Sequence, residues 1–268
     1  DIKDTDYGNN NVIGPDPDAA RHGTHVAGII AAERNNGIGM DGVANNVKIM
    51  VVRAVPDGDE RDKDIALAIR YAVDNGAKVI NTSFGKYFAT NPEWVYDAIK
   101  YAAKKDVLIV NAAGNEGIDL DTGDTVYPND QLDNKTEFAD NLISVGALNE
   151  TYGGKLVASF SNYGKSNVDV FAPGVQIYST VPGNEYEFLQ GTSMASPEVA
   201  GVAAMLRSYY PQFSAAQIKQ IILQTGVSTN IQVSAGGDPE NVKSFSQLSK
   251  SGKMVNMYNK NLEINKNS

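Results

Sequence analysis

Residues 78–113 read KVINTSFGKYFATNPEWVYDAIKYAAKKDVLIVNAA, and this stretch decides the fold. Its two ends, 78–84 and 107–113, are short apolar runs typical of buried strands. Residues 92–105, between them, are predicted to form a helix. A strand, a helix and a second strand in this order predict two parallel strands joined by a crossover helix.

The same alternation continues on both sides of this stretch. Further apolar runs predict strands at 47–55, 141–148 and 168–174. Helices are predicted from His22 to the turn at 35–37, at 62–75, at 193–209, and at 214–225, where Ser214 and Gln217 form a capping box. Because the strands are continuously apolar, we expect an α/β fold of three layers, a mostly parallel sheet with helices on both faces.

Composition excludes several classes of protein. The chain has 268 residues, of which 42% are hydrophobic, and a net charge of −9, so nucleic acid and anionic membrane surfaces are poor partners. It has no Cys, which excludes disulfides, thiolate metal sites and a cysteine nucleophile. It has two His, too few for a three-His metal site. No apolar run has the roughly 20 residues that cross a bilayer.

The segment 191–197, GTSMASP, places a serine at the mouth of a buried helix, directly after a glycine turn. A helix N-terminus offers free N–H groups and a partial positive charge. Ser193 is therefore a candidate nucleophile whose attack creates an oxyanion. The alternative is that Ser193 only caps the helix, since serine is a favoured N-cap residue. We place Pro197 in the first turn, where its missing N–H costs little.

Two other segments carry polar groups that suit the same chemistry. His22, in the segment 22–25, is a candidate base for a serine nucleophile. A metal-binding pair with His25 is the alternative, but there is no HExxH pattern, and His25 lies inside the apolar run, where we expect it to pack. Asn115 follows an apolar strand and could donate its amide to an oxyanion, or it could belong to an ordinary turn.

Together, the segments HGTHVAG (22–28), NAAGNEG (111–117) and GTSMASP (191–197) resemble the subtilisin-like serine peptidases, the subtilases. The stretches 79–85, 158–164 and 168–174 also resemble family motifs, in the order the family has them. The resemblance covers about residues 22–226, with a further match near 255–258. It implies a subtilisin-like fold and a serine endopeptidase that acts on polypeptides.

The resemblance also implies individual roles. Ser193 would be the nucleophile, His22 the general base and acid, and Asn115, with the N–H of Ser193, the oxyanion hole. Glu116, at the edge of the pocket for the residue before the cleaved bond, would favour or tolerate a basic or polar side chain. The implied substrate-binding residues are Ser83, Phe84, Gly85, Ala113, Gly114 and Glu116.

The sequence departs from the family pattern at one point. In the family, an Asp at the end of an apolar strand precedes the His. The chain has no such strand before His22. The aspartates upstream of His22 all lie in polar sequence: Asp1, Asp4, Asp6, Asp16 and Asp18. We therefore interpret residues 1–21 as a polar loop or the remnant of an upstream segment, and 22–268 as a catalytic domain that lacks its first strand. A partner segment carrying the Asp is expected.

Three further expectations follow from the resemblance. The loop 34–39, RNNGIG, resembles a calcium loop of the family, so structural calcium is expected there, although a plain Asn-Gly turn is the alternative. Location in the secreted fraction or the cell envelope is expected. The alternative to a peptidase is a catalytically impaired fragment, or a pseudo-enzyme that binds peptides without cleaving them.

Overall fold

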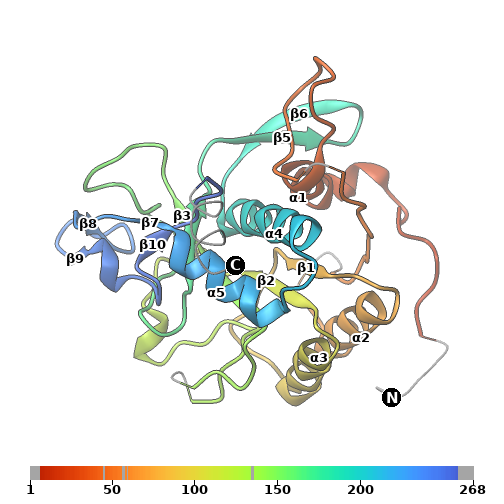
Figure 1. The fold of residues 1–268 in the computed structure, drawn as a ribbon, viewed down its shortest axis with the longest axis horizontal. Helices are drawn as coiled ribbons and strands as arrows, with labels where there is room; N and C mark the ends of the chain where they lie inside the picture. The colour runs from red at the N-terminus through yellow and green to blue at the C-terminus, as the bar shows by residue number, and fades with distance from the viewer. Residues whose placement is uncertain (1–6, 45, 56–57, 59, 134–135, 259–268) are drawn as a thin grey trace.

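The computed structural model describes residues 7–44, 46–55, 58, 60–133 and 136–258. Its centre is a six-stranded sheet (Figure 1) in the order β1-β2-β3-β4-β10-β7. Four strands come from the predicted apolar runs: β1 (Val79–Thr82), β2 (Leu108–Ala112), β3 (Leu142–Leu148) and β4 (Val170–Pro173). These four pair in parallel, and so does β10 (Lys253–Met254) with β4; only β7 (Val227–Ser228) is antiparallel.

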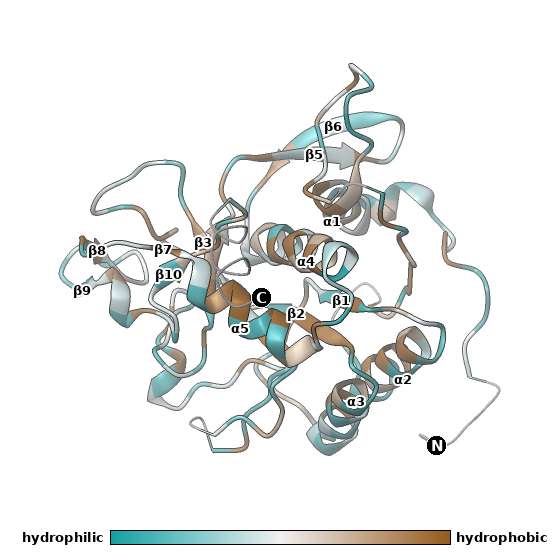
Figure 2. Cartoon of the chain, viewed as in Figure 1, coloured by the Kyte–Doolittle hydropathy of each residue, from teal (hydrophilic) through white to brown (hydrophobic). Residues whose placement is uncertain are grey.

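Helices cover both faces of this sheet, as predicted. Side chains of β2 alternate between the faces: Leu108 and Val110 pack against α4 (Thr192–Tyr209) and α5 (Ala215–Thr225), whereas Ile109 packs against α2 (Asp62–Asp74) and α3 (Pro92–Lys104). Figure 2 shows β2 and parts of these helices in the apolar colour. The three-layer α/β fold is therefore confirmed, with strands apolar on both sides because both sides are covered.

Several smaller elements complete the chain. The helix carrying the two histidines, α1 (Arg21–Ala31), follows the 3-10 turn η1 (Pro17–Ala20) and is shorter than predicted. A hairpin of β5 (Ile177–Val181) and β6 (Glu185–Leu189) lies against α1 at the top of Figure 1. The remaining elements are η2 (Leu120–Thr122), β8 (Gln232–Ser234), β9 (Val242–Ser244) and η3 (Phe245–Gln247). The capping box of Ser214 and Gln217 is present on α5.

The strand predicted at residues 47–55 is wrong. These residues form no ladder, and Ile49, Met50 and Val51 are 44%, 42% and 58% exposed. The physical reason lies next to them: within the described ranges, β1 pairs only with β2, so its other edge has no strand. An apolar run becomes a strand only where a neighbour supplies the other half of its hydrogen bonds.

The described helices include none that is both long and apolar enough to cross a bilayer. The proposed division at residue 21 remains a prediction. The described part of the segment before it, from Tyr7, contacts the body: Tyr7 Oη donates to Asp64, and Arg53 donates to Ile13 O.

Candidate active site

Ser193 is the second residue of α4, and a glycine turn leads into it. Gly191, the N-cap residue, has a φ of 146°, a conformation that favours glycine. The alternative that Ser193 is the cap is therefore wrong. Its half-buried side chain lies in the first turn of α4, where unpaired N–H groups and the helix dipole favour a developing negative charge.

Two hydrogen bonds join Ser193 to the end of β1. Ser83 Oγ donates to Ser193 O at 2.8 Å, and Ser193 Oγ donates to Ser83 O at 3.1 Å. The first bond depends on Pro197, which lies within α4, past its first turn, a correction to the sequence prediction. Because proline has no N–H, it leaves the carbonyl four residues earlier, that of Ser193, free for Ser83.

A second contact fixes α4 on the sheet. Asn81, on β1, donates from Nδ2 to Ser83 Oγ at 2.9 Å. Its Oδ1 accepts from Ser196 Oγ at 2.8 Å, and the same hydroxyl lies 3.1 Å from Val110 O on β2. The nucleophile is thus held on both β1 and β2 by side chains that the sequence analysis did not assign.

Asn115 is held in one orientation by Thr192. Its Oδ1 accepts from Thr192 N at 2.8 Å and from Thr192 Oγ1 at 3.0 Å, which leaves Nδ2 free. A methyl group placed on Gly191 would lie 3.6 Å from both Asn115 Nδ2 and Ser193 N, and 3.7 Å from Asn115 Oδ1. The two donors therefore lie close to the same glycine at the start of α4, and such a pair of donors can stabilise an oxyanion.

The loop that carries Asn115 is held by a buried residue that the sequence analysis missed, Asn162. Its Oδ1 accepts from Glu116 N and Ile118 N, both at 3.1 Å. Its Nδ2 donates to Ala113 O at 2.9 Å and to Tyr87 Oη at 3.0 Å. Asn162 lies in the family-like stretch 158–164, but a single sequence carries no signal for its role.

The predicted substrate-binding residues form two segments beside Ser193. In the first, the Ser83 side chain is buried in the bonds above, Phe84 packs on the α2–α3 core, and Gly85 is exposed. In the second, Ala113 is buried in the core and Gly114 has a φ of 102°. Both glycines adjoin neighbouring side chains: a methyl on Gly85 would lie 3.0 Å from Val126 Cγ1, and one on Gly114 would lie 2.7 Å from Tyr87 Oη. Glu116 is exposed, and no described residue pairs with it.

A groove of about 810 Å³ continues from Gly85. Its lining includes the aromatic side chains of Tyr87, Phe88 and Trp94. Lys86, at its floor, forms an ion pair of 2.6 Å with Asp62 at the start of α2. An extended peptide that leaves Ser193 along residues 83–85 would run into this groove.

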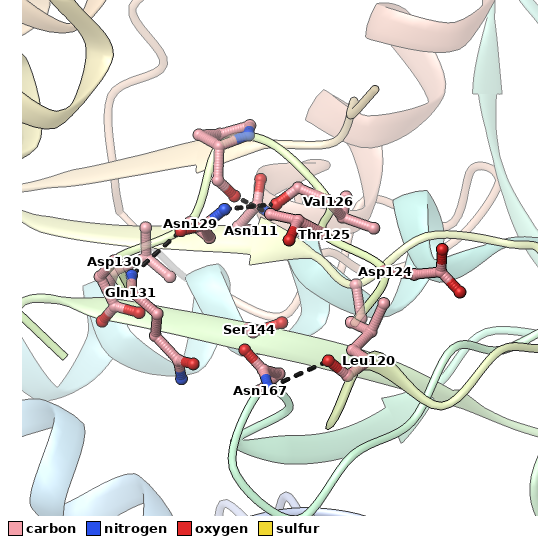
Figure 3. A pocket seen from close by; sticks show the side chains of 13 residues that line it. Asn111, Leu120, Asp124, Thr125, Val126, Asn129, Asp130, Gln131, Ser144 and Asn167 are labelled. Carbon is pink, nitrogen blue, oxygen red and sulfur yellow. Dashed lines mark hydrogen bonds between the residues drawn. The ribbon is translucent and has the colours of Figure 1, made fainter. Parts of the chain in front are cut away.

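Behind the site lies a small cavity of about 20 Å³, large enough for one water molecule (Figure 3). It is lined by Asn111, Asn129, Asp130, Gln131 and Ser144, among others. The loop that lines it also carries Tyr127, whose N–H donates to Lys86 O at 2.8 Å, next to Gly85. The loop that lines the cavity is therefore joined by this bond to the residue that follows Gly85.

His22 lies in the first turn of α1, exposed to solvent. One turn further on, Val26 and Ile29 pack against Met194, so α1 adjoins the start of α4. Partial desolvation lowers the pKa of His22, and the neighbouring His25 and Arg21 lower it further, which favours the neutral ring that a base requires. In the described part of the chain, no hydrogen bond or ion pair joins His22 to Ser193 or to a carboxylate.

The upstream aspartates do not supply that carboxylate in the described residues. Asp16 caps η1 by accepting from Asp18 N at 3.0 Å, and both side chains are exposed. Asp1, Asp4 and Asp6 lie outside the described residues. His25 is fully buried, as expected.

The loop 34–39 is held by its own hydrogen bonds. Asn36 Oδ1 accepts from Ile38 N at 2.9 Å, and Asp41 Oδ1 accepts from Asn35 N at 3.1 Å. Among the described residues, no three His, Cys, Asp or Glu side chains gather in a way that could hold a metal ion. Structural calcium at this loop stays a prediction.

Comparison with known proteins places the whole described site within one family. The profile of the subtilase family matches residues 2–252. Solved structures with the same fold include the prenylagaramide maturation protease PagA, with a TM-score of 0.69 and 27% identity over 90% of this chain and 81% of that one. A protease from Pseudoalteromonas arctica has a TM-score of 0.70 and 28% identity, over 90% of this chain and 70% of that one.

Sequence relatives are named as proteases. A thermophilic serine proteinase from Bacillus sp. (strain AK1) is 45% identical over 78% of this chain and 46% of its own length. Subtilisin DY from Bacillus licheniformis is 36% identical over 86% of this chain and 79% of its own length. A cell wall-associated protease from Bacillus subtilis (strain 168) is 38% identical over 87% of this chain and 24% of its own length. The chain thus spans less than half of two of these relatives.

Proposed function

The chain belongs to the subtilase family, and from that membership we propose that it is a serine endopeptidase that cleaves peptide bonds through an acyl-enzyme on Ser193. The observation that carries the proposal is the arrangement at the start of α4, where Thr192 fixes Asn115 Oδ1, and where Asn115 Nδ2 and Ser193 N both lie 3.6 Å from a methyl group placed on Gly191. Donors placed in advance around a developing negative charge are the largest single contribution in many enzymes of acyl transfer.

The proposed reaction has two steps. Ser193 Oγ gives up its bond to Ser83 O, turns toward the substrate carbonyl and attacks it, while His22 takes the hydroxyl proton. Asn115 and Ser193 N donate to the oxyanion. The tetrahedral intermediate expels the amine, which receives the proton from His22, and leaves an ester on Ser193. Water then attacks the ester by the same route and releases the acid.

The substrate is proposed to be an extended polypeptide. Ser83, Phe84 and Gly85 would pair with its backbone as an added strand, and Ala113 and Gly114 would face the side chain before the cleaved bond. The groove lined by Tyr87, Phe88 and Trp94 would take residues further from that bond. Glu116, exposed at the pocket, would favour a basic or polar side chain.

The base side needs one more component, a strand that ends in an aspartate. The open edge of β1 and the unpaired, exposed run 47–55 support this, because both have hydrogen-bonding groups and apolar surface for a further strand. Its carboxylate would fix the tautomer of His22 and stabilise the imidazolium. Until such a strand binds, the described residues fit the second candidate, a catalytically impaired chain: Ser193 Oγ bonds to Ser83 O, and His22 has no carboxylate.

Location in the secreted fraction or the cell envelope is part of the same proposal. Its support is the cell wall-associated protease among the relatives.

The decisive experiment asks whether Ser193 is the nucleophile. A fluorophosphonate probe is expected to label the parent enzyme and the Ser208→Ala variant, in which an exposed serine of the same helix is removed, but not Ser193→Ala. With the Asp-bearing strand supplied, turnover by Ser193→Ala is expected to fall by about 10⁶, the loss known for subtilisin itself. The melting temperature should stay near that of the parent. Retained labelling or turnover in Ser193→Ala would remove Ser193 from this role.

A further inference from the structure

His25 is one of the two histidines in the chain, and the proposed reaction does not use it. It is fully buried in α1, three residues after His22. Its Nε2 lies 3.1 Å from Ile177 O and 3.0 Å from Glu187 O. Because both partners are carbonyl oxygens, Nε2 must carry the proton and donate to them.

The other ring nitrogen has no partner. His25 Nδ1 is buried and makes no hydrogen bond. Burial lowers the pKa of His25, although the two backbone bonds oppose this, so the ring is neutral and its one N–H is its only strong contact. A buried acceptor without a partner has a cost in free energy. The contact of Nε2–H with the two carbonyl oxygens is therefore the polar contact that holds the His25 ring in place.

The two carbonyls belong to opposite strands of one hairpin. Ile177 is the first residue of β5, and Glu187 lies on β6. A single imidazole thus holds both strands at the base of the hairpin. Ser179 Oγ donates to His25 O at 2.8 Å, and a methyl on Gly28 would lie within 2.4 Å of Ser179 Oγ, so β5 touches the helix backbone.

The same hairpin leads directly to the nucleophile. β6 ends at Leu189, and the chain then passes through Gly191 into α4. Gly191 N donates to Gly174 O at 2.8 Å, which closes the base of the hairpin just before Ser193. The base of the hairpin is therefore fixed to α1 by His25 and to the start of α4 by the chain itself.

His22 has no bond of its own that sets its place relative to Ser193, so the anchoring of α1 decides it. We propose that His25 is a positioning residue, which holds the base of the β5–β6 hairpin on α1 and so sets where the His22 ring stands relative to Ser193 Oγ. The proposal rests on the roles proposed for His22 and Ser193. A misplacement of about 1 Å can cost 10²-fold in rate, so the anchor acts on turnover rather than on substrate binding.

Two amide variants separate this role from simple packing. The amide nitrogen of glutamine reaches about as far as Nε2 of histidine, whereas that of asparagine reaches only as far as Nδ1. His25→Gln can therefore keep the donor at the two carbonyls, and His25→Asn cannot. Ile222→Ala, in the α5 core, is the control for a loss of stability elsewhere.

The first measurement needs no activity. Once His25 is replaced, the NMR titration of the chain reports a single imidazole, that of His22. We expect the pKa of His22 to rise in both His25 variants, because His25 itself lowers it, and to rise further in His25→Asn than in His25→Gln as α1 loses its anchor and the His22 ring becomes better solvated. Ile222→Ala should leave it lowered. An equal rise in His25→Asn and His25→Gln would overturn the proposal, whether or not the chain is a peptidase.

The second measurement is turnover, with the upstream strand supplied. We expect His25→Asn to lower kcat by 10- to 100-fold with KM within threefold, and His25→Gln to recover most of that loss. Ile222→Ala should lower Tm without changing kcat. If His25→Asn loses only Tm, His25 is structural and the proposal fails. If it does not fold, Ser179→Ala, which removes one bond of the same anchor, should lower kcat by a smaller factor; no change there would overturn the proposal as well.

Discussion

The two halves of the candidate active site are held very differently. On the nucleophile side, Ser193 is tied to Ser83, Asn115 is tied to Thr192, and Ser196 is tied to Asn81. On the base side, His22 is exposed and has no described hydrogen bond or ion pair, and the segment 47–55 has no strand partner within the described residues.

The difference shows which contacts hold each half of the site in place. The nucleophile side uses β1, β2 and α4, which contact one another within this chain and satisfy each other's polar groups. On the base side, α1 is anchored on the β5–β6 hairpin, but no described residue orients the His22 ring. We infer that the nucleophile side forms without help, and that the base side needs a strand that this structure does not describe.

The largest expected effect is on the base side. A synthetic peptide of strand-forming sequence that ends in Asp, added to the chain, is expected to raise kcat by about 10⁴, because loss of the corresponding Asp costs subtilisin itself about 3 × 10⁴. The matched control is the same peptide with Asn in place of Asp, which should bind and protect β1 amides from hydrogen exchange without activating the enzyme. Full activity of the chain alone, with Asp1, Asp4 or Asp6 on His22, would contradict this prediction.

The next largest effect tests the nucleophile side. Asn115→Ala in the activated enzyme is expected to lower kcat by about 10²–10³, the cost of removing this type of donor in subtilisin itself. KM should change little, because the charge that the amide stabilises exists only in the transition state. The half-buried Asn149 provides a control, since Asn149→Ala should leave both constants unchanged. A raised KM with normal kcat would make Asn115 a substrate-binding residue instead.

The contrast also explains what the sequence could predict. The four apolar runs that form β1 to β4 and the capping box at Ser214 could be predicted from neighbours in the sequence, and these predictions hold in the structure. The run 47–55 has the same apolar character as β2, yet it is not a strand, because pairing depends on a partner far away in the sequence. The prediction at 47–55 therefore failed because, within the described residues, this run has no partner strand.

The sequence analysis missed the residues that hold other side chains and loops in place, for a related reason. Asn162, Asn81 and Thr192 are polar residues of common types. Each acts through contacts with a segment that is far away in the sequence. Pro197 was placed in the first turn, because its link to Ser83 through the freed Ser193 carbonyl is visible only in three dimensions. Ser193, His22 and Asn115 could be named in advance because they lie in motifs with their own spacing.

A smaller effect should show how far the nucleophile side depends on its buried support. Asn162→Asp keeps an acceptor for Glu116 N and Ile118 N but loses the donor to Ala113 O and Tyr87 Oη. We expect a loss of about 2 kcal/mol in the free energy of unfolding, because buried polar groups lose their partners. Turnover should fall by about tenfold as Asn115 becomes less well placed. Tyr87→Phe, which removes only the outer partner, is the control, and an equal effect of both variants would argue against a role for the Ala113 contact.

The smallest expected effect concerns a buried ion cluster behind the nucleophile side. Lys219, with no exposed surface, lies 3.0 Å from Glu137, 3.6 Å from Asp169 and 3.7 Å from Asp130. Burial raises the pKa of Asp130 to about 7, although Lys219 opposes this. Lys250 pairs with Glu137 at 2.6 Å, so the two lysines do not compensate all three carboxylates, and a proton on the buried Asp130 stabilises the fold.

The direction of the pH dependence follows from these charges. Between about pH 4, where Asp130 titrates in the unfolded chain, and pH 7, the folded chain holds the extra proton, so ionisation of Asp130 lowers the free energy of unfolding as pH rises. Asp130→Asn cannot ionise and escapes this loss. Its stability relative to the parent should therefore increase from pH 5 to pH 8 by about 2 kcal/mol, measured by urea denaturation at both values. The exposed Asp140 gives the control: Asp140→Asn should keep the same difference from the parent at both pH values. A constant difference for Asp130→Asn as well would mean that Asp130 stays ionised throughout, and that Lys219 balances the cluster without the extra proton.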